Sequence, residues 1–268
     1  MGFAIEVMKA EDIPEVVEVE RACFTMPWPA SAYKRELKNP KSTRYLVARH
    51  YLDNSPPLFK PEIEFHTNNG REKKHGLWHS LLPFFFKDEE GTEYIRNPNP
   101  VIGYGGVWLM MDEAHITTLG VSPEYRGKAI GEFLLVGLID VAMQLGASWL
   151  TLEVRVSNTV AQNLYRKYTF KEAGVRRKYY TDNNEDAYIM WSEEITKPAF
   201  QEKYAILKKE LFERLETEGH LAAKVDSNVP LVKPEDFPSN EETDPPPAPP
   251  IIATQPTYEE VQKREQTT

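Results

Sequence analysis

The sequence predicts an α/β (α+β) protein built on a mixed, mostly antiparallel sheet with helices on its faces. Segments in which apolar and polar residues alternate indicate strands, and segments with apolar residues at helical spacing indicate helices. One strand–helix–strand segment, 114–157, joins two strands through a helix, and such a connection makes the strands parallel and the crossover right-handed. The strands before this segment are expected to form an antiparallel meander.

The expected elements follow in a regular order. Strands are expected at 3–8, 43–51, 101–111, 114–121, 148–157, 171–180 and 186–195, and the last two should form a closing hairpin. Helices are expected at 10–24, 30–39, 131–145, 159–170 and 198–219. The parallel pair then lies between the fourth and fifth strands.

Two long segments interrupt or follow the expected domain of 1–197. About 50 residues separate the second and third strands, where a hairpin needs a turn of 2–5 residues. This insert, 53–99, is rich in proline but contains the apolar run 77–86, so we expect a partly ordered subdomain that docks on the domain or on a partner. After the amphipathic helix at 198–219, residues 220–268 hold nine of the 21 prolines and many acidic residues, which predicts a disordered tail.

Composition excludes several classes of protein. The net charge of −9 argues against a nucleic-acid binder, which needs a basic face. A single cysteine, Cys23, cannot form an internal disulfide and suits a reducing compartment. No apolar run is long enough to cross a membrane, and the first residues do not resemble a signal peptide, so a cytoplasmic location is expected. The histidines of the insert lack a metal-binding spacing, so no metal site is expected. The oligomeric state is not predicted.

A short basic loop, 126–131, leads from the fourth strand into a helix. It is not a nucleotide P-loop, because Lys128 is followed by Ala129 rather than by serine or threonine. It is not a dinucleotide-binding turn either, because the glycines at 103–106 lie inside a strand. Free N–H groups at the start of a helix favour a diphosphate, and Arg126 and Lys128 add positive charge.

Together with a second segment, this loop gives a specific pattern. The runs ITTLGVSPEYRGKAIGEFLL and LEVRVSNTVAQNLYRKYTF resemble the GNAT acetyltransferases, and among them the RimI type, which acetylates the N-terminal alanine of a small-subunit ribosomal protein. The resemblance covers 1–50 and 100–195 and leaves out the insert and the tail. It implies the GNAT fold, in which the fourth and fifth strands splay apart in a V, and acetyl-CoA as the acetyl donor.

The resemblance also implies where acetyl-CoA binds. The fourth strand would pair with the pantetheine arm, the basic loop would bind the diphosphate, and Asn158 would contact the cofactor near the thioester. The cofactor-binding residues implied in this way are Leu119, Gly120, Val121, Arg126, Gly127, Lys128, Ala129, Ile130, Gly131, Glu132 and Asn158. The chain departs from the family at Ala129 and at Thr169, where the family has glycine. Because alanine fits the first turn of a helix, we expect weakened rather than lost binding.

The expected chemistry needs a base, an oxyanion donor and an acid. Glu153 would take the proton of the attacking amine, directly or through water, and an α-amino pKa near 7.7–8.0 makes this a modest demand. A backbone N–H near Val121 would stabilise the oxyanion, and Tyr165 would protonate the leaving thiolate. Structural roles are the alternative: Glu153 would only pair with Arg155 or Arg176, and Tyr165 would belong to the core.

These residues predict an N-terminal protein acetyltransferase that works by direct transfer in a ternary complex. The acceptor is a protein or peptide N-terminus, with a ribosomal protein as the example that the resemblance supplies. One alternative is a GNAT enzyme that acetylates a small amine or a lysine side chain, and another is a degenerate, non-catalytic binding module. The insert follows the second strand, which should end on the cofactor side of the sheet, so we expect it to border the active cleft.

Overall fold

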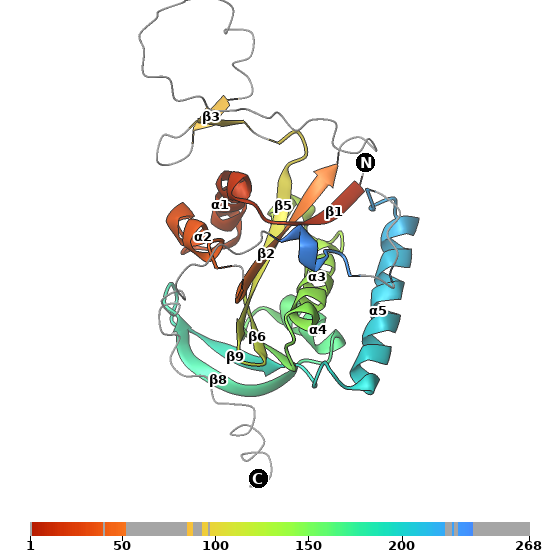
Figure 1. Cartoon of the computed structure of the whole chain (residues 1–268). Coiled ribbons are helices and arrows are strands. Elements are labelled where there is room, and N and C mark those ends of the chain that lie inside the picture. Colours follow the sequence, from red (N-terminus) through yellow and green to blue (C-terminus); the bar gives the residue numbers. More distant parts are fainter. Residues whose placement is uncertain are drawn as a thin grey trace, which may run out of the picture.

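The computed structural model describes residues 2–39, 41–51, 85–87, 93–95, 97–222, 227 and 230–237. Its centre is a seven-stranded sheet in the order β1-β2-β5-β6-β7-β9-β8 (Figure 1). The strands of the sheet are β1 (Gly2–Val7), β2 (Thr43–Tyr51), β5 (Val101–Met110), β6 (Glu113–Val121), β7 (Trp149–Arg155), β8 (Lys171–Tyr180) and β9 (Glu185–Trp191). The helices are α1 (Ile13–Cys23), α2 (Ala30–Glu36), α3 (Ile130–Gln144), α4 (Thr159–Lys167) and α5 (Pro198–Thr217).

The sheet has the predicted class. Every neighbouring pair is antiparallel except β6 and β7, which are parallel and are joined through α3. Within the insert, β3 (Phe85–Lys87) and β4 (Glu93–Ile95) form a separate two-stranded hairpin. The insert's three histidines and most of its apolar run lie outside the described residues.

The parallel pair separates after a short contact. Only Glu113, Ala114 and His115 of β6 pair with β7, although β6 continues to Val121. A register shift against β5 pairs Gly106 with Thr118 but Val107 with Ile116, which leaves Thr117 as an extra residue in β6. A bulge of this kind bends its strand and increases the local twist. The bulge follows the last β6–β7 pair by two residues, so it accounts for the predicted opening between the fourth and fifth strands.

Two apolar cores cover the two faces of the sheet. On one face lie α3, α4 and α5, and α3 is buried on most sides because it lies between the sheet and α5 (Figure 1). On the other face lie α1 and α2, whose core includes Val16, Tyr33, Tyr45 and Tyr104. Burying this apolar surface supplies the main driving force for assembling the layers.

The C-terminal helix packs back on the domain rather than standing free. Lys208 of α5 forms a buried ion pair with Asp140 of α3, with Nζ and Oδ2 2.8 Å apart, and Tyr204 donates a hydrogen bond to the same carboxylate. The backbone N–H of Leu231 also donates to Asp140. The sequence predicted a disordered tail over 220–268, but residues 230–237 pack on the domain. They do so because Val232 and Phe237 are apolar and become buried.

The ends of the insert are fixed to the sheet. Arg49 donates a hydrogen bond to the carbonyl of Asn99, and the N–H of His50 donates to the carbonyl of Pro100. β2 and β6 are each antiparallel to β5, so they run in the same direction and end at the same edge of the sheet. The insert therefore leaves the domain at the edge where β6 ends.

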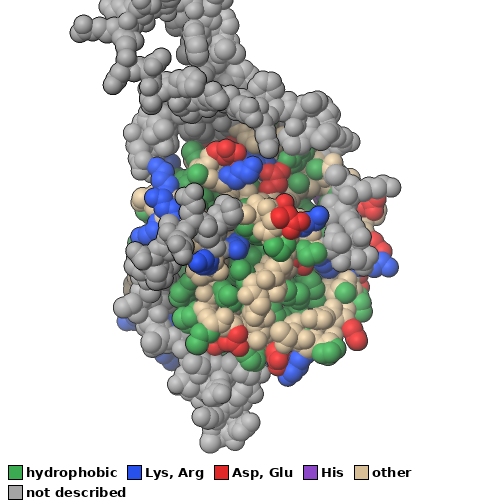
Figure 2. Space-filling model, in the orientation of Figure 1, with side chains coloured by type: hydrophobic (Ala, Val, Ile, Leu, Met, Phe, Trp, Pro, Cys, Tyr) green, Lys and Arg blue, Asp and Glu red, His purple; other side chains and the backbone are tan. Residues whose placement is uncertain are grey.

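The described part of the chain gives three further findings. Seen from the side of Figure 1, hydrophobic and uncharged atoms cover the middle of the described surface, and acidic and basic side chains lie beside one another around it (Figure 2). Among the described residues, no helix combines the length and apolarity that crossing a membrane requires. The same part of the chain contains no cluster of three or more His, Cys, Asp or Glu side chains that could hold a metal.

Candidate active site

The opening between β6 and β7 exposes the backbone of β6. The N–H of Ser122 donates to the carbonyl of Ile102 in β5, and hydrogen-bonded pairs alternate along an antiparallel ladder. Gly120 therefore bonds to Tyr104 of β5, while the backbone groups of Leu119 and Val121 point away from β5 and toward the opening. This arrangement fits the pantetheine arm of coenzyme A, whose amides would pair with the backbone of Leu119 and the N–H of Val121 like an added strand; the carbonyl of Val121 already accepts from Cys23 and Arg126.

Gly120 contributes space at the opening, since its own backbone hydrogen bonds go to β5. A Cβ atom at this position would lie 2.9 Å from a ring carbon of Tyr104 and 3.5 Å from Sγ of Cys23. Contacts as short as the first are essentially never made by real Cβ atoms, so the Tyr104 ring can pack against β6 here only because residue 120 is glycine.

The basic loop enters α3 in a conformation that the sequence did not predict. A short turn, Pro123–Tyr125, precedes it, and Arg126 donates from Nε to the carbonyl of Val121 at 3.1 Å. Gly127 has φ +78°, and Ala129 has φ +60° as the N-cap of α3. The expectation that Ala129 fits a helical first turn was therefore wrong. Ala129 is left-handed instead, and this region of backbone conformation disfavours any residue with a Cβ.

The start of α3 has the donor groups that a diphosphate needs. The first N–H groups of a helix have no partner within it, and the helix dipole adds partial positive charge. Lys128 is exposed, with Nζ 5.0 Å from the ring centre of Tyr125, and Ile130 is buried in the core. A Cβ at Gly131 would make only ordinary contacts, the nearest at 3.8 Å from Val121. These residues fit the diphosphate of coenzyme A.

Glu153 is a buried carboxylate on β7. Its side chain is 3% exposed, and Oε2 lies 2.7 Å from Nε2 of His115 on β6. Oε1 lies 3.3 Å from Nη1 of Arg176 on β8. The structure therefore contains the ion pair between Glu153 and Arg176 that the structural alternative expected. Arg155 forms its ion pairs with other side chains. An ion pair and a histidine on opposite oxygens hold the carboxylate in one orientation.

Tyr165 approaches from the other face of the sheet. It belongs to the core formed with α3, together with Leu152 and Val154 of β7, and it is 7% exposed. Side chains alternate across a strand, so Glu153 projects from the face opposite to Leu152 and Val154. The two predicted catalytic side chains could therefore meet only through the opening between β6 and β7. Burial, and then the neighbouring Tyr180, raises the pKa of Tyr165, so its hydroxyl keeps its proton at neutral pH.

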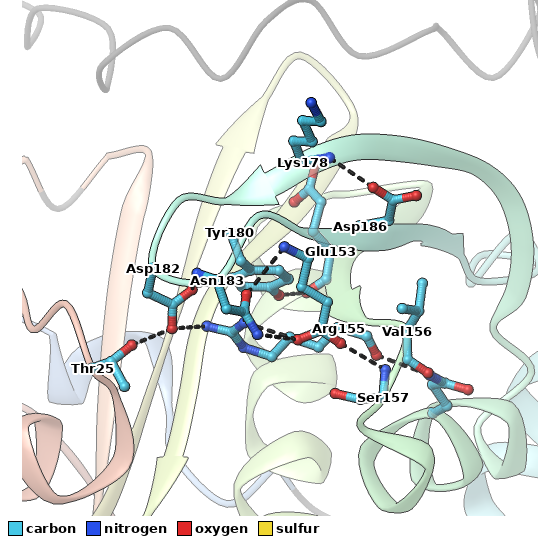
Figure 3. A network of polar contacts seen from close by, with 12 residues as sticks. Thr25, Glu153, Arg155, Val156, Ser157, Lys178, Tyr180, Asp182, Asn183 and Asp186 are labelled. Carbon is cyan, nitrogen blue, oxygen red and sulfur yellow. Dashed lines mark hydrogen bonds and ion pairs between the residues drawn. The ribbon is translucent and has the colours of Figure 1, made fainter.

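A polar network connects β7, the β8–β9 turn and the α1–α2 loop (Figure 3). The guanidinium of Arg155 lies over the ring of Tyr180, with 3.8 Å between Cζ and the ring centre, and donates to Asp182 at 2.8 Å. Asp182 also accepts a hydrogen bond from Thr25, in the loop after α1. Burial raises the pKa of Tyr180 to about 12, and its hydroxyl contacts the backbone carbonyl of Glu153 at 3.5 Å. This network joins the α1–α2 loop to two segments that are far from it in the sequence.

The remaining predicted residues have defined local roles. Asn158 is the N-cap of α4, where its side chain accepts the N–H of Ala161 at 3.2 Å. Thr169 has φ +72° directly after Tyr168, the C-cap of α4, and the N–H of Phe170 bonds back to the carbonyl of Tyr165, so this departure from glycine lies where the helix terminates. Glu132 accepts hydrogen bonds from three side chains.

Cys23 lies closer to the opening than its sequence position suggested. Its Sγ donates to the carbonyl of Val121 at 3.2 Å. Burial raises the pKa of the Cys23 thiol, and the nearby Arg126 only partly opposes this effect. A thiol that keeps its proton is a poor nucleophile.

Sequence reasoning missed His115, although a signal was present. His115 occupies the last β6 position that pairs with β7, opposite Thr151, and strand alternation places Glu153 on the same face as Thr151. Pairing the two predicted strands in register would have placed this histidine beside the carboxylate. The sequence also named Arg176 as a possible partner of Glu153, but Asp182 carried no such signal, because the register of the closing hairpin shifts twice.

Comparisons with known proteins show which family the chain resembles. The profile of the acetyltransferase (GNAT) family matches residues 57–170. A Bacillus subtilis protein, provisionally named a ribosomal protein bS18-alanine N-acetyltransferase, is 33% identical over 188 residues, which span 70% of this chain and 93% of that protein. The ribosomal protein bS18-alanine N-acetyltransferase of Escherichia coli K12 is 44% identical over 111 residues, 39% of this chain and 75% of that protein.

Among solved structures, the ribosomal-protein-S18-alanine N-acetyltransferase of Escherichia coli aligns with a TM-score of 0.48 and 24% identity, over 71% of this chain and 92% of that one. The match to the Bacillus subtilis relative extends over nearly the whole of that protein. The chain therefore belongs to the acetyltransferase (GNAT) family.

Proposed function

We propose that the chain transfers the acetyl group of acetyl-CoA to the N-terminal amine of a protein or peptide. The observation that carries this proposal is the buried Glu153 carboxylate beside the opening between β6 and β7, held by His115 and Arg176. The names of the Bacillus subtilis and Escherichia coli relatives support a ribosomal-protein N-terminus as the acceptor. A cytoplasmic location stays a prediction.

Glu153 acts as the general base in this proposal. A carboxylate fixed on both oxygens has little freedom, so an amine or a bridging water would meet it in one geometry. His115 keeps the carboxylate oriented through its 2.7 Å contact and provides a route for the proton to leave the buried site. Because a free α-amino group has a pKa near 7.7–8.0, part of it is already neutral near pH 7, and the carboxylate needs only to accept the proton that the nitrogen loses as it attacks.

Tyr165 acts as the general acid, and acetyl-CoA supplies the activated acetyl group when it is bound. The raised pKa of Tyr165 keeps the phenol protonated, which is the state that donates to a leaving thiolate. The N–H of Val121 points into the opening and can stabilise the oxyanion. Direct transfer is favoured over an acyl-enzyme, because the chain's single thiol has a raised pKa and donates to a carbonyl.

Coenzyme A release measured with a panel of peptides tests the proposed function. Peptides with a free N-terminal alanine should be acetylated, and the same peptides with a blocked N-terminus and a free lysine should not. Acetylation of the blocked peptides would move the function to lysine side chains. No release with any peptide, together with measurable binding of acetyl-CoA, would favour a binding module.

A further inference from the structure

Glu132 lies in the first turn of α3 and has three partners. It is the third residue of the helix, and its side chain is 10% exposed. Oε1 lies 2.6 Å from Nζ of Lys167 and 2.9 Å from the hydroxyl of Tyr168, and Oε2 lies 2.6 Å from Nη2 of Arg214. Burial favours the neutral acid, but these hydrogen bonds outweigh it and hold the pKa of Glu132 below its usual value. The group is therefore a carboxylate at neutral pH.

A carboxylate at this place has two opposite effects. It stabilises the helix, because the helix dipole favours negative charge in the first turn. It also opposes a diphosphate that binds to the N–H groups of the same turn, because the two negative charges lie within about 10 Å, where screening is incomplete. Lys167 and Arg214 outweigh the negative charge of Glu132: with one negative and two positive side chains, the cluster has a net charge of +1.

Arg214 reaches the cluster from a helix that lies outside the family profile. The profile ends at residue 170, and α5 begins at Pro198. Packing holds α5 in place, because the rings of Phe212 and Phe133 meet edge to face at 5.7 Å and Lys208 pairs with Asp140. Figure 1 shows α5 alongside α3 and α4. The part of α5 that carries Arg214 is therefore held beside α3 by contacts that do not involve Glu132.

We propose that Arg214 is a positioning residue for the diphosphate of coenzyme A: with Lys167, it offsets the charge of Glu132 and makes α5 part of the cofactor site. This inference rests on the proposed function, because it assumes that acetyl-CoA binds at the start of α3. The simpler interpretation is that Arg214 only stabilises the packing of α5 on α3. The two interpretations predict different affinities for coenzyme A when Glu132 loses its charge.

The affinity for coenzyme A distinguishes the two interpretations when it is measured for four proteins: the wild type, Arg214→Met, Glu132→Gln and the double variant. Their cluster charges are +1, 0, +2 and +1, since each substitution removes one known charge. We expect Arg214→Met to bind coenzyme A about three- to tenfold more weakly at low ionic strength, and Glu132→Gln to bind it more tightly by a similar factor. The double variant should bind like the wild type. Arg214→Met leaves Glu132 paired with Lys167, so no buried charge loses its last partner.

Three controls make the result specific. Lys209→Met removes a positive charge from an exposed side chain of the same helix, 3.8 Å from Glu213, and should leave binding unchanged. Arg214→Lys keeps the charge and should bind nearly as tightly as the wild type. Pantetheine lacks the diphosphate, so its binding should be the same in all four proteins, and added salt should shrink the differences seen with coenzyme A.

A double variant that binds coenzyme A as weakly as Arg214→Met would overturn the proposal, because the loss would then be structural. Equal weakening of pantetheine binding would overturn it in the same way. Failure of the wild type to bind coenzyme A would instead reject the proposed function, so the two failures are distinguishable.

Discussion

Replacing Ala129 with glycine should stabilise the protein, which is unusual for a change that removes a side-chain atom. Ala129 is held at φ +60° as the N-cap of α3. A left-handed conformation costs an L-residue roughly 1–2 kcal/mol, and glycine avoids this cost. Glycine loses more backbone entropy on folding than alanine, by roughly 0.5–1 kcal/mol. The difference leaves a net stabilisation of about 0.5–1 kcal/mol for Ala129→Gly.

The two neighbouring glycines provide matched controls. Gly127 has φ +78° and nothing within 4 Å of an added Cβ, so Gly127→Ala adds backbone strain without a clash and should destabilise by a similar amount. Gly131 lies in the helix without a positive φ, and its nearest neighbour would be 3.8 Å away. Gly131→Ala should therefore be neutral or mildly stabilising.

Urea unfolding followed by far-ultraviolet circular dichroism, together with thermal melting, measures the three variants. A change of 1 kcal/mol shifts Tm by about 2–4 °C in a domain of this size, so Ala129→Gly should raise Tm by roughly 1–4 °C. The opposite ordering, with Gly127→Ala more stable than the wild type and Ala129→Gly less stable, would refute the assignment of strain to residue 129.

Four further predictions concern the site and its surroundings. Glu153→Gln should cut turnover at least about a hundredfold with little effect on acetyl-CoA affinity, and full activity across pH 7–9 would remove Glu153 as the base. Tyr165→Phe should slow acetyl transfer in single turnovers, and an unchanged rate would exclude Tyr165 as the acid. Hydrogen bonds, the largest effect coming from Ser157, lower the pKa of Glu185 in the folded protein to about 2. The charged carboxylate therefore stabilises the fold above the pKa of the unfolded chain, and this stabilisation is lost as the pH falls through the folded value. Glu185→Gln should make stability fall less steeply between about pH 4.5 and 2, and an unchanged slope would contradict this. Replacing 54–96 with a short Gly-Ser linker keeps the contacts of Asn99 and Pro100 and should change peptide preference if the insert borders the cleft; identical preferences would show that it does not.

The sequence by itself determined the order of the elements and the parallel pair that opens. Periodicity is local: alternation along β6 and β7 and the apolar stripes of α3 and α4 can be recognised without knowing the partner. The chirality of a strand–helix–strand connection then fixes which strands are parallel. For the same reason Glu153 could be assigned to the polar face of its strand and Tyr165 to the buried side of its helix.

Only the tertiary structure decided which groups surround these residues. The partners of Glu153 come from β6 and β8, and Arg214 reaches Glu132 across 82 positions of the sequence. The left-handed backbone of Ala129 likewise depends on the path from the end of β6 to α3. Contacts of this kind arise when the whole sheet and its helices pack, so their distances and charges are absent from any local pattern. The sequence therefore located the candidate acid and base, and the assembled fold determined their electrostatic surroundings.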